Sequence, residues 1–292
     1  MKADSRFLKQ PKTFWANVRT ISAEVGYTVR GKKQIKVPSL PEMGVALRGL
    51  GLDDRHILDS SERPTPFGKL LFEYFSYRAR VLNTFVEARL MDGREAKVEF
   101  EKLRKTWKRC HLPLNKQKGE KRAPAYLTGI VNMIIEANAA EWDCDYNPRS
   151  LTTVTRNNLP VRTLARWVDG AFPATVNPIT IWEVKEYYYT TTFGSRVADG
   201  VYESLLDGME LEELLEHEAI DVKHYLMIDA YDTWWKQGKS YLCRMVDMIH
   251  MGYVDEILFG REVIERLPIL VRKWVTEARR RDRIQKQVRN TP

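Results

Sequence analysis

The chain has 292 residues, of which 43% are hydrophobic and 29% charged, and its formal net charge at pH 7 is +8. This length allows one large domain or two modest ones, and the eight Trp and thirteen Tyr residues exclude a disordered chain, because such side chains drive core formation. The positive charge favours a polyanionic partner such as nucleic acid.

The cysteines and the apolar segments indicate where the protein resides. Cys110, Cys144 and Cys243 are too widely spaced for a disulfide framework or a zinc motif, so we expect a reducing, cytoplasmic environment. Residues 1–10 lack the apolar core of a secretion signal, and no apolar run approaches the ~20 residues of a membrane span, so we expect no membrane association. No phosphate-binding glycine motif is present, so we expect no nucleotide cofactor.

Residues 1–116 are predicted to be mainly helical and to supply DNA contacts. Apolar spacing predicts helices over residues 14–25, 40–50, 67–90 and 94–110, the first two ended by Gly26 and Gly51. The segment ISAEVGYT is compatible with the first half of a DNA-reading helix-turn-helix or with a plain helical hairpin. The basic stretch that follows contributes three candidate DNA contacts, Lys32, Lys33 and Lys36.

Residues 117–292 follow a polar, basic loop that ends at Pro124 and show a mixed pattern. We expect strands over residues 161–172, 180–189 and 223–235, and helices over 126–142, 193–218, 241–259 and 263–283. The alternation predicts an α/β fold in which a mixed central sheet is flanked by helices.

Three residues on two of these strands form the candidate catalytic centre. Asp169 is expected at the end of one strand, at an Asp-Gly turn, while Glu183 and Lys185 lie two residues apart on the next and therefore share a face. A loop bounded by Pro173 and Pro178 can return the chain so that Asp169 and Glu183 meet. Two carboxylates are suited to Mg²⁺, with Mn²⁺ as a substitute, and a neighbouring lysine can orient a water or neutralise developing charge. The backbone carbonyl of Val184, between the two side chains, is a further candidate ligand.

Asp169 followed by Glu183-Val-Lys185 resembles the signature of the PD-(D/E)XK nuclease superfamily, which has the restriction-endonuclease-like fold. The resemblance implies that the two acidic residues are metal ligands and that the lysine assists the attacking water. It also implies a further acidic ligand on the preceding helix, for which Glu136 is the matching residue. The chain departs from the motif in having Val168 where the family carries proline.

The short motif, an acidic residue two positions before a lysine, recurs elsewhere in the chain. The surrounding residues therefore determine which copy is the candidate site. Glu95-Ala-Lys97 lies in a charged helical segment, and Asp221-Val-Lys223 has no carboxylate-bearing strand upstream. Glu183 has apolar strand residues around it and a helix after it. An exposed cross-strand ion pair would use the same residues without any catalysis.

The helix expected after this strand offers two phosphate contacts. Ser195 is expected to cap the helix, whose first N–H groups attract anions, and Arg196 is the candidate for a direct contact, although a surface salt-bridge face would look the same.

These observations favour an Mg²⁺-dependent endonuclease that hydrolyses double-stranded DNA, of the type II restriction kind. Because a double-strand cut needs two active sites, we expect a homodimer. Two alternatives stay open: a low-specificity antiphage or repair nuclease, and a nucleic-acid-binding protein without catalysis.

Overall fold

The computed structural model describes residues 1–8, 10–29, 34–107, 110, 112–115, 123–189 and 194–289, without the side chains of residues 195, 196, 285, 288 and 289. Helices α1 (Lys12–Val25), α2 (Leu40–Gly49), α3 (Pro66–Val81) and α4 (Gly93–Thr106) occupy the N-terminal part, with a π-helical turn, η1 (Leu82–Val86), after α3. The four expected N-terminal helices are therefore confirmed, with shifted ends.

The central sheet has the strand order β3-β4-β5-β6 and is mixed. Its strands are β3 (Gly170–Phe172), β4 (Thr180–Glu186), β5 (Lys223–Asp229) and β6 (Glu256–Phe259). Strand β3 runs antiparallel to β4, whereas β4, β5 and β6 are parallel. Parallel neighbours require crossovers, which are supplied by α6 (Ser195–Glu218), and by the π-helical turn η2 (Asp232–Gln237) with α7 (Lys239–His250).

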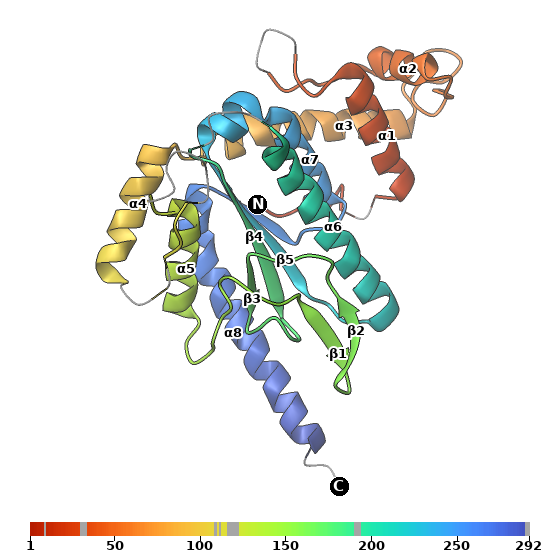
Figure 1. The fold of residues 1–292 in the computed structure, drawn as a ribbon. Helices are drawn as coiled ribbons and strands as arrows, with labels where there is room; N and C mark the ends of the chain where they lie inside the picture. Colours follow the sequence, from red (N-terminus) through yellow and green to blue (C-terminus); the bar gives the residue numbers. More distant parts are fainter. Residues whose placement is uncertain are drawn as a thin grey trace.

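Helices cover both faces of this sheet (Figure 1). One face packs Trp182, Tyr225 and Met227 against α5 (Tyr126–Asn138) and α8 (Arg261–Arg289). The other packs Leu226 and Ile228 against α6 and α7. The protein is therefore mixed α/β, as expected.

Helices α1, α2 and α3 form a separate apolar cluster around Phe14, Trp15 and Tyr74. The chain between α1 and α2 runs from Gly26 to Ser39, whereas a helix-turn-helix joins its helices through three or four residues. The DNA-reading helix-turn-helix interpretation of ISAEVGYT is therefore wrong.

The observed secondary structure differs from the expectations at three places. The strand expected over residues 161–172 is two strands, β2 (Leu159–Thr163) and β3, separated by an irregular segment. A hairpin was missed, in which β2 pairs with β1 (Thr153–Arg156). The helix expected over residues 241–259 ends at His250, and its last residues form β6.

The expected division near Lys116 falls outside the described residues. Helix α4 precedes that point yet packs through Ala96 and Phe100 against α5, in the core of the second half. Packing of the sheet region therefore begins upstream of the expected boundary. No helix among the described residues is both long and apolar enough to cross a membrane.

Candidate functional site

Asp169 and Glu183 meet where strand β3 begins. Gly170 pairs with Trp182 across β3 and β4, which places Asp169 opposite Glu183. The Asp169 backbone N–H donates to Glu183 Oε1 at 3.1 Å, and the Val184 backbone N–H donates to Asp169 Oδ2 at 2.9 Å. The expected convergence is therefore present, although Asp169 precedes its strand rather than ending one.

Gly170 permits this close pairing. A Cβ atom at this position would lie 2.1 Å from the Trp182 ring, too close for any side chain. Trp182 stacks in turn on Trp274 of α8, with ring centroids 5.7 Å apart. The bare backbone at Gly170 thus lets the ring lie over β3 while Asp169 stays beside Glu183 on the other face.

Lys185 lies on the same face of β4 as Glu183, as the strand alternation predicts. Its Nζ donates to Glu183 Oε2 at 2.6 Å and to Glu203 Oε2 of α6 at 2.9 Å. Helix α6 approaches closely because Gly200 has no side chain: a Cβ there would lie 3.3 Å from the Lys185 Cδ. The lysine is only 6% exposed, whereas Glu183 is fully buried.

Sequence reasoning did not assign three members of this site, Arg166, Glu203 and Asp207. Arg166, in the segment between β2 and β3, contacts Glu183 Oε1 at 3.0 Å and Asp207 Oδ2 at 2.6 Å. Its Nη2 also lies 3.3 Å from Glu203. A signal was present on α6, where Glu203 and Asp207 are four residues apart and therefore project from one face.

These six residues, which we call the α6 cluster, contain four carboxylates and two cations: Asp169, Glu183, Glu203 and Asp207 with Arg166 and Lys185. Its formal charge is therefore −2. One carboxylate oxygen, Asp207 Oδ1, is buried without a hydrogen-bond partner among the described residues. Such an oxygen is costly to bury, and a cation would satisfy it.

The pKa values of the carboxylates in the α6 cluster agree with this excess of negative charge. Burial raises the pKa of Asp169 to about 6, and the charge of Glu183 reinforces the shift. Burial likewise raises the pKa of Asp207 to about 7. Burial alone would raise the pKa of Glu183, but Lys185 and Arg166 outweigh it and lower that pKa to about 2. Glu183 is thus the permanent anion of the cluster.

Lys185 is a cation in this setting. Burial alone would lower its pKa, but the carboxylates of Glu183, Asp169 and Glu203 outweigh burial and raise it. Such a lysine donates hydrogen bonds and does not serve as a base at neutral pH.

The structure does not bring Glu136 to the α6 cluster. Glu136 lies on α5, which covers the opposite face of the sheet, and its carboxylate interacts with the Cys110 thiol. The order of motif residues along the chain cannot tell which face a helix covers, and the expectation based on the resemblance is wrong here. At Val184, the observed contact is made by the N–H group, and the expected role of its carbonyl stays a prediction.

The expected DNA contacts are only partly within the described structure. Lys36 forms an ion pair with Glu42, which reduces its availability for phosphate. Lys32 and Lys33 lie outside the described residues. Ser195 begins α6 with Gly194 in the capping position, so Ser195 is not the cap. The side chains of Ser195 and Arg196 also lie outside the described part.

The fit to a metal rests on two carboxylates. Within the described residues, no group of three or more His, Cys, Asp and Glu side chains is placed to hold an ion. Mg²⁺ is commonly held by one or two carboxylates, with waters and substrate phosphates completing its shell. Asp169 and Glu183 are adjacent carboxylates in a cluster of formal charge −2, and they are the pair that would hold such an ion.

Comparison with known proteins gives two family matches. Residues 1–85 match the model described as Domain of unknown function (DUF7690). Residues 91–274, well over half of the chain, match the model described as Domain of unknown function (DUF7687). The two matches meet between residues 85 and 91, where α3 and η1 give way to α4. Neither the curated proteins nor the solved structures contain a match. The chain belongs to the family described as Domain of unknown function (DUF7687).

Proposed function

We propose that this protein is an Mg²⁺-dependent endonuclease that hydrolyses DNA phosphodiester bonds at the α6 cluster. The observation that carries the proposal is the convergence of Asp169, Glu183 and Lys185 at one point, through hydrogen bonds of 2.6–3.1 Å. The mixed sheet with a parallel crossover after β4 supports a restriction-endonuclease-like core. The net charge of +8 supports a polyanionic substrate.

Each residue has a role that follows from its surroundings. Asp169 and Glu183 would hold Mg²⁺, which when bound stabilises charge on the reacting phosphate and acidifies a water. Lys185, held as a cation between Glu183 and Glu203, would donate to the attacking water or to a phosphate oxygen. Arg166 would keep Glu183 oriented from the opposite side.

One observation favours a second candidate, a nucleic-acid-binding protein without catalysis. Glu183 is fully buried and accepts from both Lys185 and Arg166, as it would in a purely structural ion network. One feature weighs against that function: the cluster has more carboxylates than cations, and an uncompensated buried charge is costly.

The direct experiment is cleavage of plasmid DNA with Mg²⁺ or Mn²⁺ by the wild type and by Lys185→Met. We expect the substitution to lower the cleavage rate on the order of 10²–10³-fold, the usual cost of removing one stabilising donor. The matched control is Lys223→Met, which removes the lysine of the Asp221-Val-Lys223 motif, bound to Asp221 at 2.7 Å and Asp255 at 3.0 Å. The control should cut like the wild type.

Absence of cleavage by the wild type on DNA and RNA with either metal would overturn the proposal. Equal rates for Lys185→Met and the wild type would show that the activity resides elsewhere. Discrete products would support a sequence-specific restriction enzyme, whereas a smear would support the low-specificity antiphage or repair function.

A further inference from the structure

A pocket lies where the N-terminal helices meet the sheet region. It has a volume of about 310 Å³. Its walls come from α1 and the residues just after it, from α6 and from α7: Arg19, Ala23, Tyr27, Val201, Tyr202, Leu205, Arg244, Asp247 and Met248. The volume falls in the range of sites that bind small molecules.

Two arginines in this pocket carry charge without a carboxylate partner. Arg244 donates to Tyr202 Oη at 3.0 Å and to Tyr27 Oη at 3.4 Å, both neutral acceptors. The exposed Arg19 contacts the sulfur of Met251 at 3.4 Å. Among the residues that the structure describes, neither arginine forms an ion pair. Guanidinium groups in this condition are suited to bind a phosphate.

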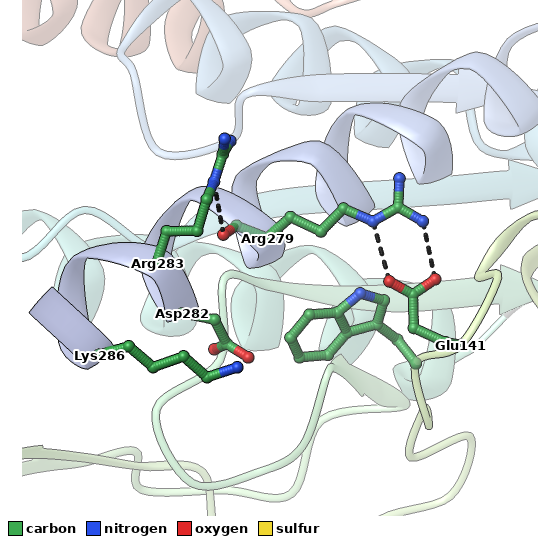
Figure 2. A pocket seen from close by; sticks show the side chains of 6 residues that line it. Glu141, Arg279, Asp282, Arg283 and Lys286 are labelled. Atoms are coloured by element: carbon green, nitrogen blue, oxygen red, sulfur yellow. Dashed lines mark hydrogen bonds and ion pairs between the residues drawn. The ribbon is translucent and has the colours of Figure 1, made fainter.

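A cavity of about 640 Å³ at the end of α8 provides the contrast (Figure 2). Its Arg279 donates two hydrogen bonds to Glu141, at 2.8 and 2.7 Å. The dashed lines in Figure 2 show this arginine already engaged by a carboxylate. Arg279 is therefore less available to a phosphate than Arg19 and Arg244, which makes it a suitable control residue.

Aromatic rings provide the rest of the recognition surface. The Arg244 guanidinium lies 5.2 Å from the centroid of the Tyr27 ring, so cation and ring are presented together. Tyr202 is 54% exposed, so its ring is accessible to a ligand. Flat rings beside a cation are the usual platform for a nucleic-acid base.

The polar floor of the pocket is already satisfied. Asp247, only 4% exposed, accepts from Arg78 at 3.0 and 2.9 Å and from Tyr74 Oη at 2.6 Å. Its negative charge is therefore matched within the protein, and it does not oppose an anion at the pocket mouth.

We propose that this pocket binds one nucleotide unit, with the phosphate on Arg19 and Arg244 and the base against Tyr27 and Tyr202. The unit can be a free mononucleotide or an unpaired nucleotide of a nucleic acid, and the chemistry of recognition is the same. The inference does not rest on the proposed function, because it uses none of the residues of the α6 cluster. The two sites share helix α6, on which Tyr202 and Glu203 are adjacent.

The test is calorimetric titration of the full chain with deoxyadenosine monophosphate in EDTA, which removes any contribution from divalent metal. We expect Arg244→Gln and Arg19→Gln each to weaken binding about tenfold or more, the cost of a charge-assisted hydrogen bond. Tyr202→Leu should weaken the nucleotide but not inorganic phosphate. The matched control, Arg279→Gln, should bind like the wild type, and the melting temperature of each variant checks its fold.

Three results would overturn the inference. The first is no binding of the mononucleotide or of a short single-stranded oligonucleotide. The second is unchanged binding in the folded Arg244→Gln and Arg19→Gln variants. The third is equal affinity for inorganic phosphate and the nucleotide, which would remove the role of the rings. Competition by single-stranded DNA would assign the unit to a nucleic acid, and binding of the free mononucleotide alone would assign it to a soluble ligand.

Discussion

Two charge clusters, one between α3 and α7 and the other between β4 and α6, differ in their balance. Arg78 and Asp247 are 1% and 4% exposed, and one cation faces one carboxylate, with Tyr74 completing the contacts. In the α6 cluster four carboxylates face two cations. The charges of the first pair are matched one to one, whereas the second cluster has a formal charge of −2.

The charge balance of the two clusters indicates a structural role for the first and a functional role for the second. Burial of an ion pair is weak evidence for either, because desolvation offsets much of the attraction. The Arg78–Asp247 pair joins α3 to α7 and fixes the N-terminal helices to the sheet region. The α6 cluster has an excess of carboxylates instead, and under the proposed function a bound divalent cation offsets that excess.

The largest effect is expected when the balanced pair is broken. Arg78→Met leaves Asp247 buried without compensation and should lower the free energy of unfolding by about 3–5 kcal/mol. Urea denaturation measures this loss. The double variant Arg78→Met/Asp247→Leu should recover much of it, because no charge is then buried. A single variant as stable as the wild type would show that this pair contributes nothing to the junction.

A smaller effect is expected when the unbalanced cluster loses a cation. Arg166→Met removes the contacts to Glu183 and Asp207 and should cost about 2 kcal/mol in EDTA. Mg²⁺ should restore part of this loss, since added positive charge relieves the larger excess of carboxylates. The recovery is measured as the rise in melting temperature when Mg²⁺ is added. The control is Arg78→Met, whose melting temperature should rise only as much as that of the wild type. An Arg166→Met melting temperature indifferent to Mg²⁺ would contradict the charge argument.

The smallest effect, up to about 1.4 kcal/mol per pH unit, concerns a carboxylate without any ion pair among the described residues. Asp229 is fully buried and accepts from the N–H groups of Met91 and Ala230 and from Tyr188 Oη. Burial raises its pKa from 3.8 to about 7, against these hydrogen bonds. Between those pH values the folded state holds a proton that the unfolded chain has released, so stability falls as pH rises.

Asp229→Asn removes this proton and should flatten the decline by up to about 1.4 kcal/mol per pH unit, the value for one proton. Urea denaturation of both proteins from pH 4.5 to 7.5 gives the two slopes. Asp169, Glu186 and Asp207, whose pKa values are also raised, leave a residual decline in the variant. Parallel slopes would mean that Asp229 is ionised throughout.

The sequence predicted what depends on alternation and missed what depends on packing. The period of two placed Glu183 and Lys185 on one face, and the proline-bounded loop brought Asp169 to them. Arg166 was not assigned, because it lies in irregular backbone between β2 and β3, where no periodicity operates. The face covered by α5, which separates Glu136 from the site, is set by tertiary packing alone.

The missed strands have local explanations. The β1–β2 hairpin turns at Asn157 and Asn158, whose φ values of 51° and 65° suit a tight hairpin turn. The usual Asn-Gly signal is absent, and Pro160 within β2 argues against a strand except at an edge. Gly252, with a φ of 89°, follows the end of α7 and is a residue that commonly ends a helix. The apolar residues that continue into β6 nevertheless favoured a longer helix in the sequence.

The central claim is that Asp169 and Glu183 hold a divalent cation, and titration of the metal-free protein with Mg²⁺ tests it most directly. We expect calorimetry to show binding to the wild type, with Mn²⁺ as a second probe. Asp169→Asn should weaken it at least tenfold, the factor that corresponds to about 1.4 kcal/mol. Asp221→Asn, which alters the exposed carboxylate of the Asp221-Val-Lys223 motif, is the matched control and should bind like the wild type. Wild-type protein that binds neither metal, or an Asp169→Asn variant that binds as the wild type does, would contradict the account.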